Sequence, residues 1–418
     1  MGKPASRIGR YELISALATG GMGRIFLART TGIGGFARNV VVKTLEVPVT
    51  DDNDPAIGMF LDEARLLGLL HHHHVVSVYE VGRDDGGRYY MVLDYIDGYS
   101  AHDVIERAND YGAALPLDFA LTVASAVAGG LHHAHTRRDG AGRPLGIVHR
   151  DVTPSNVVVG YDGAIKLIDF GIALAIERKT ETQPGFVKGK VGYLAPEQVV
   201  GRAVDARADV FALGVLLYEL TTLHRAFRDS SDLATMQRIK AGKIVRPSRV
   251  VADYPLELER IVMRALAVDP KDRYPDADEV RRAIEALGHQ LHFVLGDAAV
   301  IEVMAQLFPP AAPGAFARAP SRMSDPALEW AESERDLTVR RDPAELLAAI
   351  HAELAATAPP AEPEPEPEPE PPPPEVRPRK LRAATEVADA LIVHAADASM
   401  TALPAAAPAA PPGSPPPL

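Results

Sequence analysis

The stretch His149-Arg150-Asp151-Val152-Thr153-Pro154-Ser155-Asn156 is followed, thirteen positions after Asn156, by Asp169-Phe170-Gly171. Residues of these types suit phosphoryl transfer. A protein catalyses this reaction mainly by positioning and electrostatic stabilisation, so the reaction needs an Asp near the acceptor hydroxyl, and an Asn and a second Asp near Mg²⁺. Asp151, Asn156 and Asp169 are side chains of these types. The apolar residues 157–159 and 165–168 flank Asp162-Gly163, which predicts a β-hairpin that fixes the spacing of the two motifs.

The bulk composition predicts one large folded unit followed by a tail. The chain has 418 residues, 47% of them apolar, which suffices for a sizeable core. Its formal net charge of −12 argues against a general nucleic-acid binder. The absence of cysteine excludes disulfides, Cys-ligated zinc and a catalytic thiol, and it suits a reducing cytoplasm.

No stretch of the sequence has the length and apolar character of a membrane span. Residues 120–131 are apolar but too short, and residues 210–220 include Glu219. The first six residues lack the apolar core of a signal peptide. We therefore expect a soluble, cytoplasmic protein with no membrane span and no nucleic-acid partner.

A glycine-rich turn follows the first predicted strand. Residues 11–17 alternate in polarity like a strand and run into Ala18-Thr19-Gly20-Gly21-Met22-Gly23. Glycines lack side chains, so their backbone N–H groups can come close to phosphate groups. Taken alone, the same pattern also fits an ordinary hairpin turn.

A lysine and a glutamate are predicted to pair near this turn. Lys43 ends the strand-like run 40–43, and Asp54-Pro55 predicts the start of a helix. One face of that helix collects the residues Phe60, Glu63, Leu67 and Leu70. Because an unpaired buried carboxylate is costly, we expect Glu63 to bind Lys43.

Four consecutive histidines, residues 71–74, occupy the expected turn between this helix and a strand that begins at Val75. Four neighbouring side chains cannot all point at one ion from regular structure, so the pattern favours a turn over a metal site. Farther along, residues 89–93 predict a strand and residues 117–138 an alanine-rich buried helix. Residues 172–190 show no periodicity, and a helix is expected from Asp209.

In this order and spacing, the motifs resemble those of the eukaryotic-type serine/threonine protein kinases of bacteria, over residues 11–287. The resemblance rests on the motifs already quoted together with Ala195-Pro196-Glu197 and Asp269-Pro270-Lys271-Asp272-Arg273. It implies an α+β, bilobal protein-kinase fold, with a small β-rich N-lobe, a larger helical C-lobe and a largely disordered C-terminal tail.

The expected organisation along the chain has five parts. An N-terminal arm covers residues 1–10 and the kinase domain residues 11–288. A helical, partly ordered extension covers residues 289–357, and we expect one or two helices over residues 291–308 and a short amphipathic helix from Asp342. Residues 358–376 alternate Pro and Glu as a stiff spacer, and residues 377–418 form a low-complexity Ala/Pro tail. Such a spacer holds something at a distance, either a docking peptide for a partner protein or a segment that feeds back on the kinase.

The resemblance implies roles for the central polar residues, with ATP and Mg²⁺ as cofactors. Lys43 would hold the α- and β-phosphates and pair with Glu63. Asp151 would accept or orient the proton of the acceptor hydroxyl, and Asn156 and Asp169 would bind Mg²⁺. The residues expected around the nucleotide are Leu17, Gly20, Gly21, Gly23, Ile25, Val41, Lys43, Leu93 as gatekeeper, Asp94 and Ile96 through hinge backbone groups, and Asn156.

Other family positions imply structural and regulatory roles. Glu197 would form a buried ion pair with Arg273, and Asp209 would brace the backbone of the catalytic loop, residues 149–156. The apolar spine that links the lobes would consist of Leu67, Val78, His149 and Phe170. Residues 172–190 have the place of the family's activation loop. In this family an arginine at the position of Arg150 accompanies control by a phosphate on that loop, and Thr180 and Thr182 are the expected phosphate acceptors.

Two departures from the family pattern involve exchanged residue types. The family usually has lysine two residues after the catalytic Asp, where this chain has Thr153, and a threonine where this chain has Lys190. We hypothesise that Lys190 reaches back to Thr153 and supplies the missing positive charge at the transferring phosphoryl group. The alternative is two independent changes, with Lys190 in solvent.

The favoured function is an ATP-dependent serine/threonine protein kinase that autophosphorylates its activation loop and acts on Ser/Thr hydroxyls of protein substrates. Ser/Thr specificity rests on Pro154 and on the overall resemblance. One alternative is a pseudokinase that serves as a nucleotide-binding scaffold, supported by Ala18 and Thr153. Another, a small-molecule phosphotransferase, is weakened by residues 195–197 and 269–273, which in the family build a platform for protein substrates.

Overall fold

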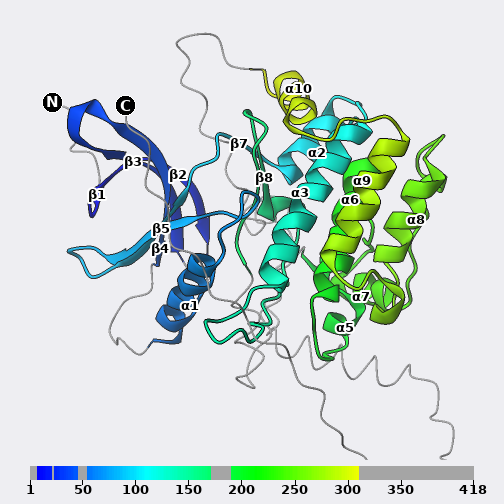
Figure 1. Ribbon diagram of the computed structural model, residues 1–418, viewed down its shortest axis with the longest axis horizontal. Coiled ribbons are helices and arrows are strands. Elements are labelled where there is room, and N and C mark those ends of the chain that lie inside the picture. Colours follow the sequence, from blue (N-terminus) through cyan, green and yellow to red (C-terminus); the bar gives the residue numbers. More distant parts are fainter. Residues whose placement is uncertain (1–6, 21–22, 46–53, 171–189, 310–418) are drawn as a thin grey trace, which may run out of the picture. The chain divides into compact units, whose positions relative to one another are not determined.

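The computed structural model describes residues 7–20, 23–45, 54–170 and 190–309, and these form two lobes. The first lobe is a six-stranded antiparallel sheet in the order β1-β2-β3-β4-β6-β5, accompanied by helix α1 (Figure 1). Its elements are β1 Arg7–Ile8, β2 Tyr11–Gly20, β3 Gly23–Thr31, β4 Ala37–Leu45, α1 Pro55–Leu69, β5 Val78–Arg83 and β6 Tyr89–Asp94.

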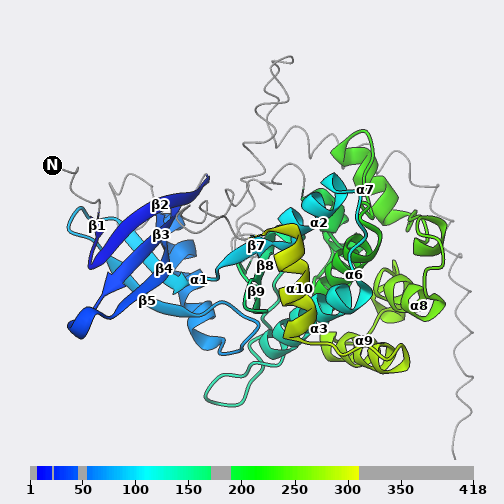
Figure 2. The ribbon, with the colours of Figure 1, turned by 90° about the horizontal axis from the view of Figure 1, so that it is seen from above.

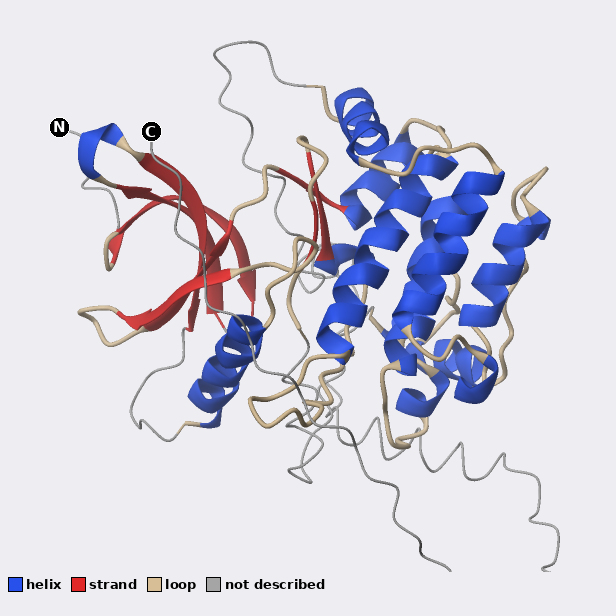
Figure 3. Ribbon diagram, viewed as in Figure 1, coloured by secondary structure: helices blue, strands red, loops and turns tan. Residues whose placement is uncertain are grey.

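The second lobe is mostly helical and contains a small three-stranded sheet (Figure 3). The strands are β7 Gly98–Ser100, β8 Val157–Gly160 and β9 Ile165–Leu167. The helices are α2 Ala101–Asp110, α3 Leu117–His135, α5 Pro196–Val199, α6 Arg207–Thr222, α7 Asp232–Lys240, α8 Leu256–Ala265, α9 Ala277–Gln290 and α10 Asp297–Leu307. This architecture confirms the predicted α+β, two-lobed fold.

Helix α1 begins where its sequence predicts. The side chain of Asp54 accepts a hydrogen bond from Ala56 N at 2.8 Å, and Pro55 occupies the first turn, where its missing N–H is not needed. Phe60 and Leu67 are buried on the face that carries Glu63. The helix therefore turns Glu63 toward the sheet.

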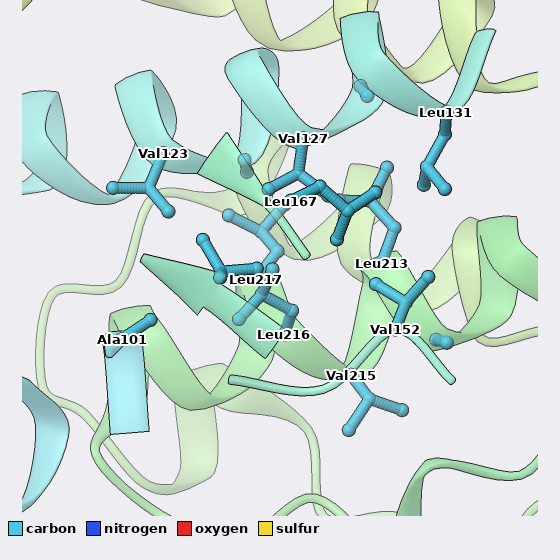
Figure 4. Close-up of a cluster of buried hydrophobic side chains, with 14 of the residues drawn as sticks. Ala101, Val123, Val127, Leu131, Val152, Leu167, Leu213, Val215, Leu216 and Leu217 are labelled. Atoms are coloured by element: carbon cyan, nitrogen blue, oxygen red, sulfur yellow. The ribbon is translucent and has the colours of Figure 1, made fainter. Parts of the chain in front are cut away.

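The core of the helical lobe is built between α3 and α6. Val123, Val127 and Leu131 of α3 meet Leu213, Leu216 and Leu217 of α6, together with Val152 and Leu167 (Figure 4). Almost every residue of α6 is buried, which is typical of a helix that is apolar on all sides. The catalytic-loop residue Val152 is thus anchored in the same core as the helices.

The predicted hairpin between the two motifs is present as β8 and β9, which pair antiparallel. Its turn requires glycine at Gly163, where φ is +88°. A Cβ at this position would also lie 2.5 Å from Cβ of Asp297, at the start of α10. The hairpin therefore packs closely against a helix that lies far along the chain.

Residues 291–308, expected to hold one or two helices, contain the single helix α10. It packs on α2, α3 and β8 (Figure 2). Its residues Val300, Val303 and Met304 are buried in the main core. Just after it, Phe308 stacks on Tyr99 with ring centroids 3.9 Å apart. The core of the helical lobe thus includes Phe308.

Some element boundaries differ from the expectation. The strand expected from Val75 begins at Val78, because Val75 forms only an isolated bridge to Leu167. Helix α3 ends at His135 rather than near Arg138. None of the helices in the described ranges combines the length and apolar character needed to cross a bilayer. The helix expected from Asp342 and the expected spacer lie outside the described residues.

Candidate active site

An open cleft is lined by residues from both lobes. Its walls consist of Leu17, Ile25, Val41, Lys43, Leu67, Val76, Leu93, Asp94, Tyr95, Ile96, Gly98, Tyr99, Ser100, Asp103, Val158, Ile168 and Asp169. These include the seven non-glycine residues expected around a nucleotide, apart from Asn156. The mainly apolar walls with a few polar groups are typical of a small-molecule site.

Among the described residues that line this cleft, the predicted glycine Gly23 does not occur. Gly20 and Gly23 face each other across the hairpin of β2 and β3, and Gly21 lies outside the described residues. A Cβ at Gly23 would lie 1.7 Å from the backbone oxygen of Thr44 on β4. Strand packing therefore requires glycine at this position whether or not a phosphate binds there.

The predicted ion pair between Lys43 and Glu63 is present at the inner end of the cleft. Lys43 Nζ lies 2.7 Å from Glu63 Oε1 and 3.2 Å from Asp169 Oδ1. Burial alone would lower the pKa of Lys43, but the charges of Asp169 and Glu63 outweigh it and raise that pKa. The positive charge of Lys43 in turn holds the pKa of Asp169 below its usual value. The lysine therefore stays charged and Asp169 stays ionised.

Burial raises the pKa of Glu63, and the charge of Lys43 only partly opposes this effect. The glutamate thus depends on its lysine partner to remain a carboxylate, in agreement with its position on an apolar helix face. Helical periodicity placed Glu63 on an apolar face, and together with the cost of burying an unpaired carboxylate it was enough to predict this contact.

Asp209 holds the catalytic loop through its backbone, as expected. Its Oδ2 accepts a hydrogen bond from His149 N at 2.7 Å and its Oδ1 one from Arg150 N at 2.8 Å. Arg150 has φ +67°, a conformation that costs energy for a residue with a side chain. The two bonds offset that strain.

His135 also binds Asp209 and was not predicted. Its Nε2 lies 2.8 Å from Asp209 Oδ2 in a buried contact. Burial alone would raise the pKa of Asp209, but the hydrogen bond and charge interaction with His135 help to lower it. No local pattern indicated this role, because His135 ends a helix that is 74 residues away in sequence.

Asp151 is held by two nitrogen donors. Asn156 Nδ2 donates to both the backbone oxygen and Oδ2 of Asp151, each at 2.8 Å. Lys190 Nζ donates to the same Oδ2 at 2.5 Å. The expected contact between Lys190 and Thr153 is therefore wrong: within the described ranges, the buried Thr153 Oγ1 has no hydrogen-bond partner, and Lys190 binds Asp151 instead.

Asn156 and Asp169 fit a magnesium site that is completed by phosphate oxygens. Backbone pairing of Ile168 N with Asn156 O at 2.9 Å links the two segments, and the Nδ2 of Asn156 points to Asp151, which leaves its Oδ1 as the potential ligand. No cluster of three or more His, Cys, Asp or Glu side chains in the described part of the chain could hold a metal alone. Mg²⁺ typically binds one or two carboxylates plus substrate phosphates, so the two side chains suit it.

The predicted ion pair of Glu197 and Arg273 is present and bidentate. Arg273 Nη1 and Nη2 lie 2.7 Å from Glu197 Oε1 and Oε2. The side chains are 0% and 7% exposed, so both charges are buried. The pair ties α5 to the turn that precedes α9.

The four expected spine residues all belong to or pack on the main core. Leu67 and Phe170 belong to the main core, the half-buried Val78 packs against that core, and His149 is buried as well. The rings of His149 and Phe170 have centroids 4.4 Å apart. Burial lowers the pKa of His149, which favours the neutral, stackable ring. Thr180 and Thr182 lie outside the described residues.

The cleft also contains a carboxylate that sequence reasoning missed. Asp103 of α2 lines the cleft, and burial raises its pKa. Its Oδ2 accepts a hydrogen bond from Ser100 Oγ at 2.6 Å, while Ser100 Oγ accepts one from Asp103 N. The spacing of Ser100 and Asp103 before an apolar run is a capping-box pattern, which could have placed a helix start here.

Comparison with known proteins matches this chain to one family model and to several bacterial relatives. The model described as "Protein kinase domain" matches residues 11–289. "Tyrosine-protein kinase MasK" of Myxococcus xanthus is 43% identical over 66% of this chain and 43% of its own length. "Serine/threonine-protein kinase PknB" of Mycolicibacterium smegmatis is 35% identical over 65% of this chain and 42% of its own length. "Serine/threonine-protein kinase PrkC" of Bacillus subtilis is 32% identical over 66% and 40%. The matches thus span less than half of each relative.

Proposed function

This chain belongs to the protein kinase family, and we propose that it transfers the γ-phosphoryl group of Mg-ATP to serine and threonine hydroxyls of proteins. The observation that carries this proposal is that Lys43 and Asp169 pair in the wall of the cleft, while the backbone of Asn156 binds that of Ile168, next to Asp169. Lys43, Glu63 and Asp169 are joined by ion pairs, and Asp151 is oriented by Asn156 nearby. The expected residue types at all five positions, four of them charged, argue for catalysis over a pseudokinase scaffold.

In the proposed reaction, the acceptor oxygen forms a bond to the γ-phosphorus while the bond from that phosphorus to the bridging oxygen of ADP breaks. The bonding electron pair leaves with ADP, and Asp151 accepts the hydroxyl proton. Lys43 binds the α- and β-phosphates, held in place by Glu63. Mg²⁺, bound by Asp169 and Asn156, would neutralise charge on the β- and γ-phosphate oxygens.

The apolar walls suit the adenine and its sugar. Leu17, Val41 and Leu93 offer apolar contacts, and the backbone near Asp94 and Ile96 offers hydrogen-bonding groups to the adenine edge. We also infer that Thr180 and Thr182 are autophosphorylation sites read by Arg150, that the reaction occurs in the cytoplasm where ATP is available, and that the acidic Pro-Glu tail docks a partner protein.

Acceptor specificity is the part of the proposal that most needs a test. Ser/Thr transfer is supported by Pro154 and by the names of two relatives, whereas another relative is named a tyrosine kinase. The full chain is incubated with labelled ATP and Mg²⁺ beside Asp169→Ala, followed by phosphoamino-acid analysis and site mapping. Label on serine or threonine that is absent in Asp169→Ala supports the proposal. Label only on tyrosine would refute the specificity, and ATP binding without label would favour the scaffold.

A further inference from the structure

The side chain of Lys190 lies at the proposed proton acceptor but has no part in the reaction described above. Its Nζ is 2.5 Å from Asp151 Oδ2, although the two residues are 39 positions apart. The lysine side chain is 28% exposed and that of Asp151 16% exposed. The pair therefore lies at the mouth of the site, neither sealed in the core nor free in solvent.

The backbone beneath Lys190 is firmly held. Lys190 precedes the 3₁₀ turn Val191–Tyr193, and its carbonyl accepts a hydrogen bond from Tyr193 N at 3.1 Å. Tyr193 Oη donates to the buried Glu219 at 2.8 Å. A Cβ at Gly192 would lie 2.6 Å from the backbone oxygen of Phe227, which shows how closely this turn packs on the helical lobe. The ammonium group is thus positioned by a fixed support.

Lys43 and Lys190 place their positive charges at different ends of the site. Lys43 is occupied by Glu63 and Asp169 at the inner end of the cleft, where metal and inner phosphates belong. At the Asp151 end, residue 153 of the catalytic loop offers only a buried hydroxyl, which has no partner in the described ranges. Lys190 therefore brings a second positive charge to the site, at the carboxylate of Asp151.

We propose that Lys190 is a further catalytic residue, which binds an oxygen of the transferring γ-phosphoryl group while it holds Asp151. This inference rests on the proposed kinase activity. An ammonium group has three donors, and Asp151 Oδ2 uses one of them. A second donor can reach a non-bridging phosphate oxygen while the acceptor oxygen bonds to phosphorus, the proton passes to Asp151 and the electron pair leaves with ADP. The protein thus places its second phosphate-binding charge on the segment before α5 instead of on the catalytic loop.

The expected effect is on the rate of transfer more than on binding. Removal of one such preorganised donor typically lowers kcat by about 10²–10³-fold, so Lys190→Ala should lower kcat by about 100-fold. The KM for ATP should change by less than about threefold, because Lys43 and the apolar walls still hold the nucleotide. A merely structural residue would not give this separation of kcat from KM.

The experiment measures steady-state phosphate transfer to a generic protein acceptor by the full chain and four variants. Lys190→Ala removes the charge, and Lys190→Arg keeps it. The exchange variant Thr153→Lys/Lys190→Thr moves the charge to the catalytic loop. Arg246→Ala is the matched control, because it also breaks an ion pair with a buried carboxylate, Glu259 at 3.0 Å, on a surface away from the cleft. Thermal melting and binding of Mg-ATP verify that each variant is folded.

A large loss of kcat in Lys190→Ala that Lys190→Arg or the exchange variant at least partly restores supports the proposal. An unchanged rate in Lys190→Ala would overturn it, and a faster rate would show that the pair blocks Asp151. A loss that neither charged variant restores would also overturn it, because the position would then be structural. If the wild type itself transfers no phosphate, the proposed function fails instead.

Discussion

The buried pair of Glu197 and Arg273 predicts a large loss of stability when one charge is removed. In Glu197→Gln, the guanidinium of Arg273 stays in the interior without its carboxylate, and breaking a buried pair in this way costs about 3–5 kcal/mol. Arg273 keeps hydrogen bonds to the backbone oxygens of Ala267, Arg207 and Val268. We therefore expect the lower end of the range, a decrease of about 3 kcal/mol in the free energy of unfolding.

The assay is thermal melting followed by circular dichroism at pH 7, with wild type and Glu197→Gln side by side. A decrease of about 3 kcal/mol corresponds to a fall in Tm of about 6–12 °C for a domain of this size class. The control is Arg260→Ala, which breaks a pair with Glu257 whose side chains are 72% and 47% exposed. Such a surface pair contributes less than about 1 kcal/mol. If Glu197→Gln melted as Arg260→Ala does, the reasoning from burial would be refuted.

Three further predictions concern glycine packing, the C-terminal helix and the histidine run. Gly23→Ala should lower Tm strongly, because a Cβ at this position would lie 1.7 Å from the backbone oxygen of Thr44. Gly58→Ala, at a helix position with open space around it, should stabilise the protein by up to about 1 kcal/mol. Equal Tm values for the two variants would contradict this prediction. Phe308→Ala should destabilise the protein by about 3 kcal/mol and raise the KM for ATP, because it removes the buried ring stacked on the cleft residue Tyr99. Ile301→Ala on the exposed side of α10 serves as its control in melting and kinetics, and similar values for both would argue against the helix as a cleft support. Burial, with the neighbouring histidines, lowers the pKa of His72 from 6.5 to about 4, so the contribution of neutral His72 to stability is present above pH 6.5 and is lost as the pH falls toward 4. Urea unfolding across this range should show a smaller loss of unfolding free energy for His72→Gln than for wild type. Parallel curves of unfolding free energy against pH for the two proteins would contradict this prediction.

Several contacts of the site were predictable because local patterns demand a partner. Glu63 lies on an apolar helix face, so burial required a cation, and Lys43 was the residue at hand. The hairpin between the motifs followed from Asp162-Gly163 between apolar runs, and Gly163 indeed adopts a positive φ. In both cases the pattern lies within a short stretch of sequence: the apolar face of helix α1 for Glu63, and the turn between two adjacent strands for Gly163.

Other contacts depend on the path of the chain in three dimensions, which no local pattern reports. The sequence indicated that Lys190 replaces a missing charge, but the partner it binds is Asp151, not Thr153. His135 reaches Asp209 from the end of another helix. Gly23 fits the expected glycine-rich turn, yet the close approach of β4 already accounts for it. Each difference reflects packing between elements that are distant in sequence.

The central claim, that this cleft transfers phosphate by using Asp151 as proton acceptor, is tested most directly by comparing Asp151→Asn with wild type in transfer from labelled Mg-ATP and in equilibrium binding of Mg-ATP. The asparagine preserves the size of the side chain and removes its charge and basicity. We expect transfer to fall by about 10²–10⁴-fold while the affinity for Mg-ATP changes by less than about threefold. Wild-type transfer rates in Asp151→Asn would contradict the account.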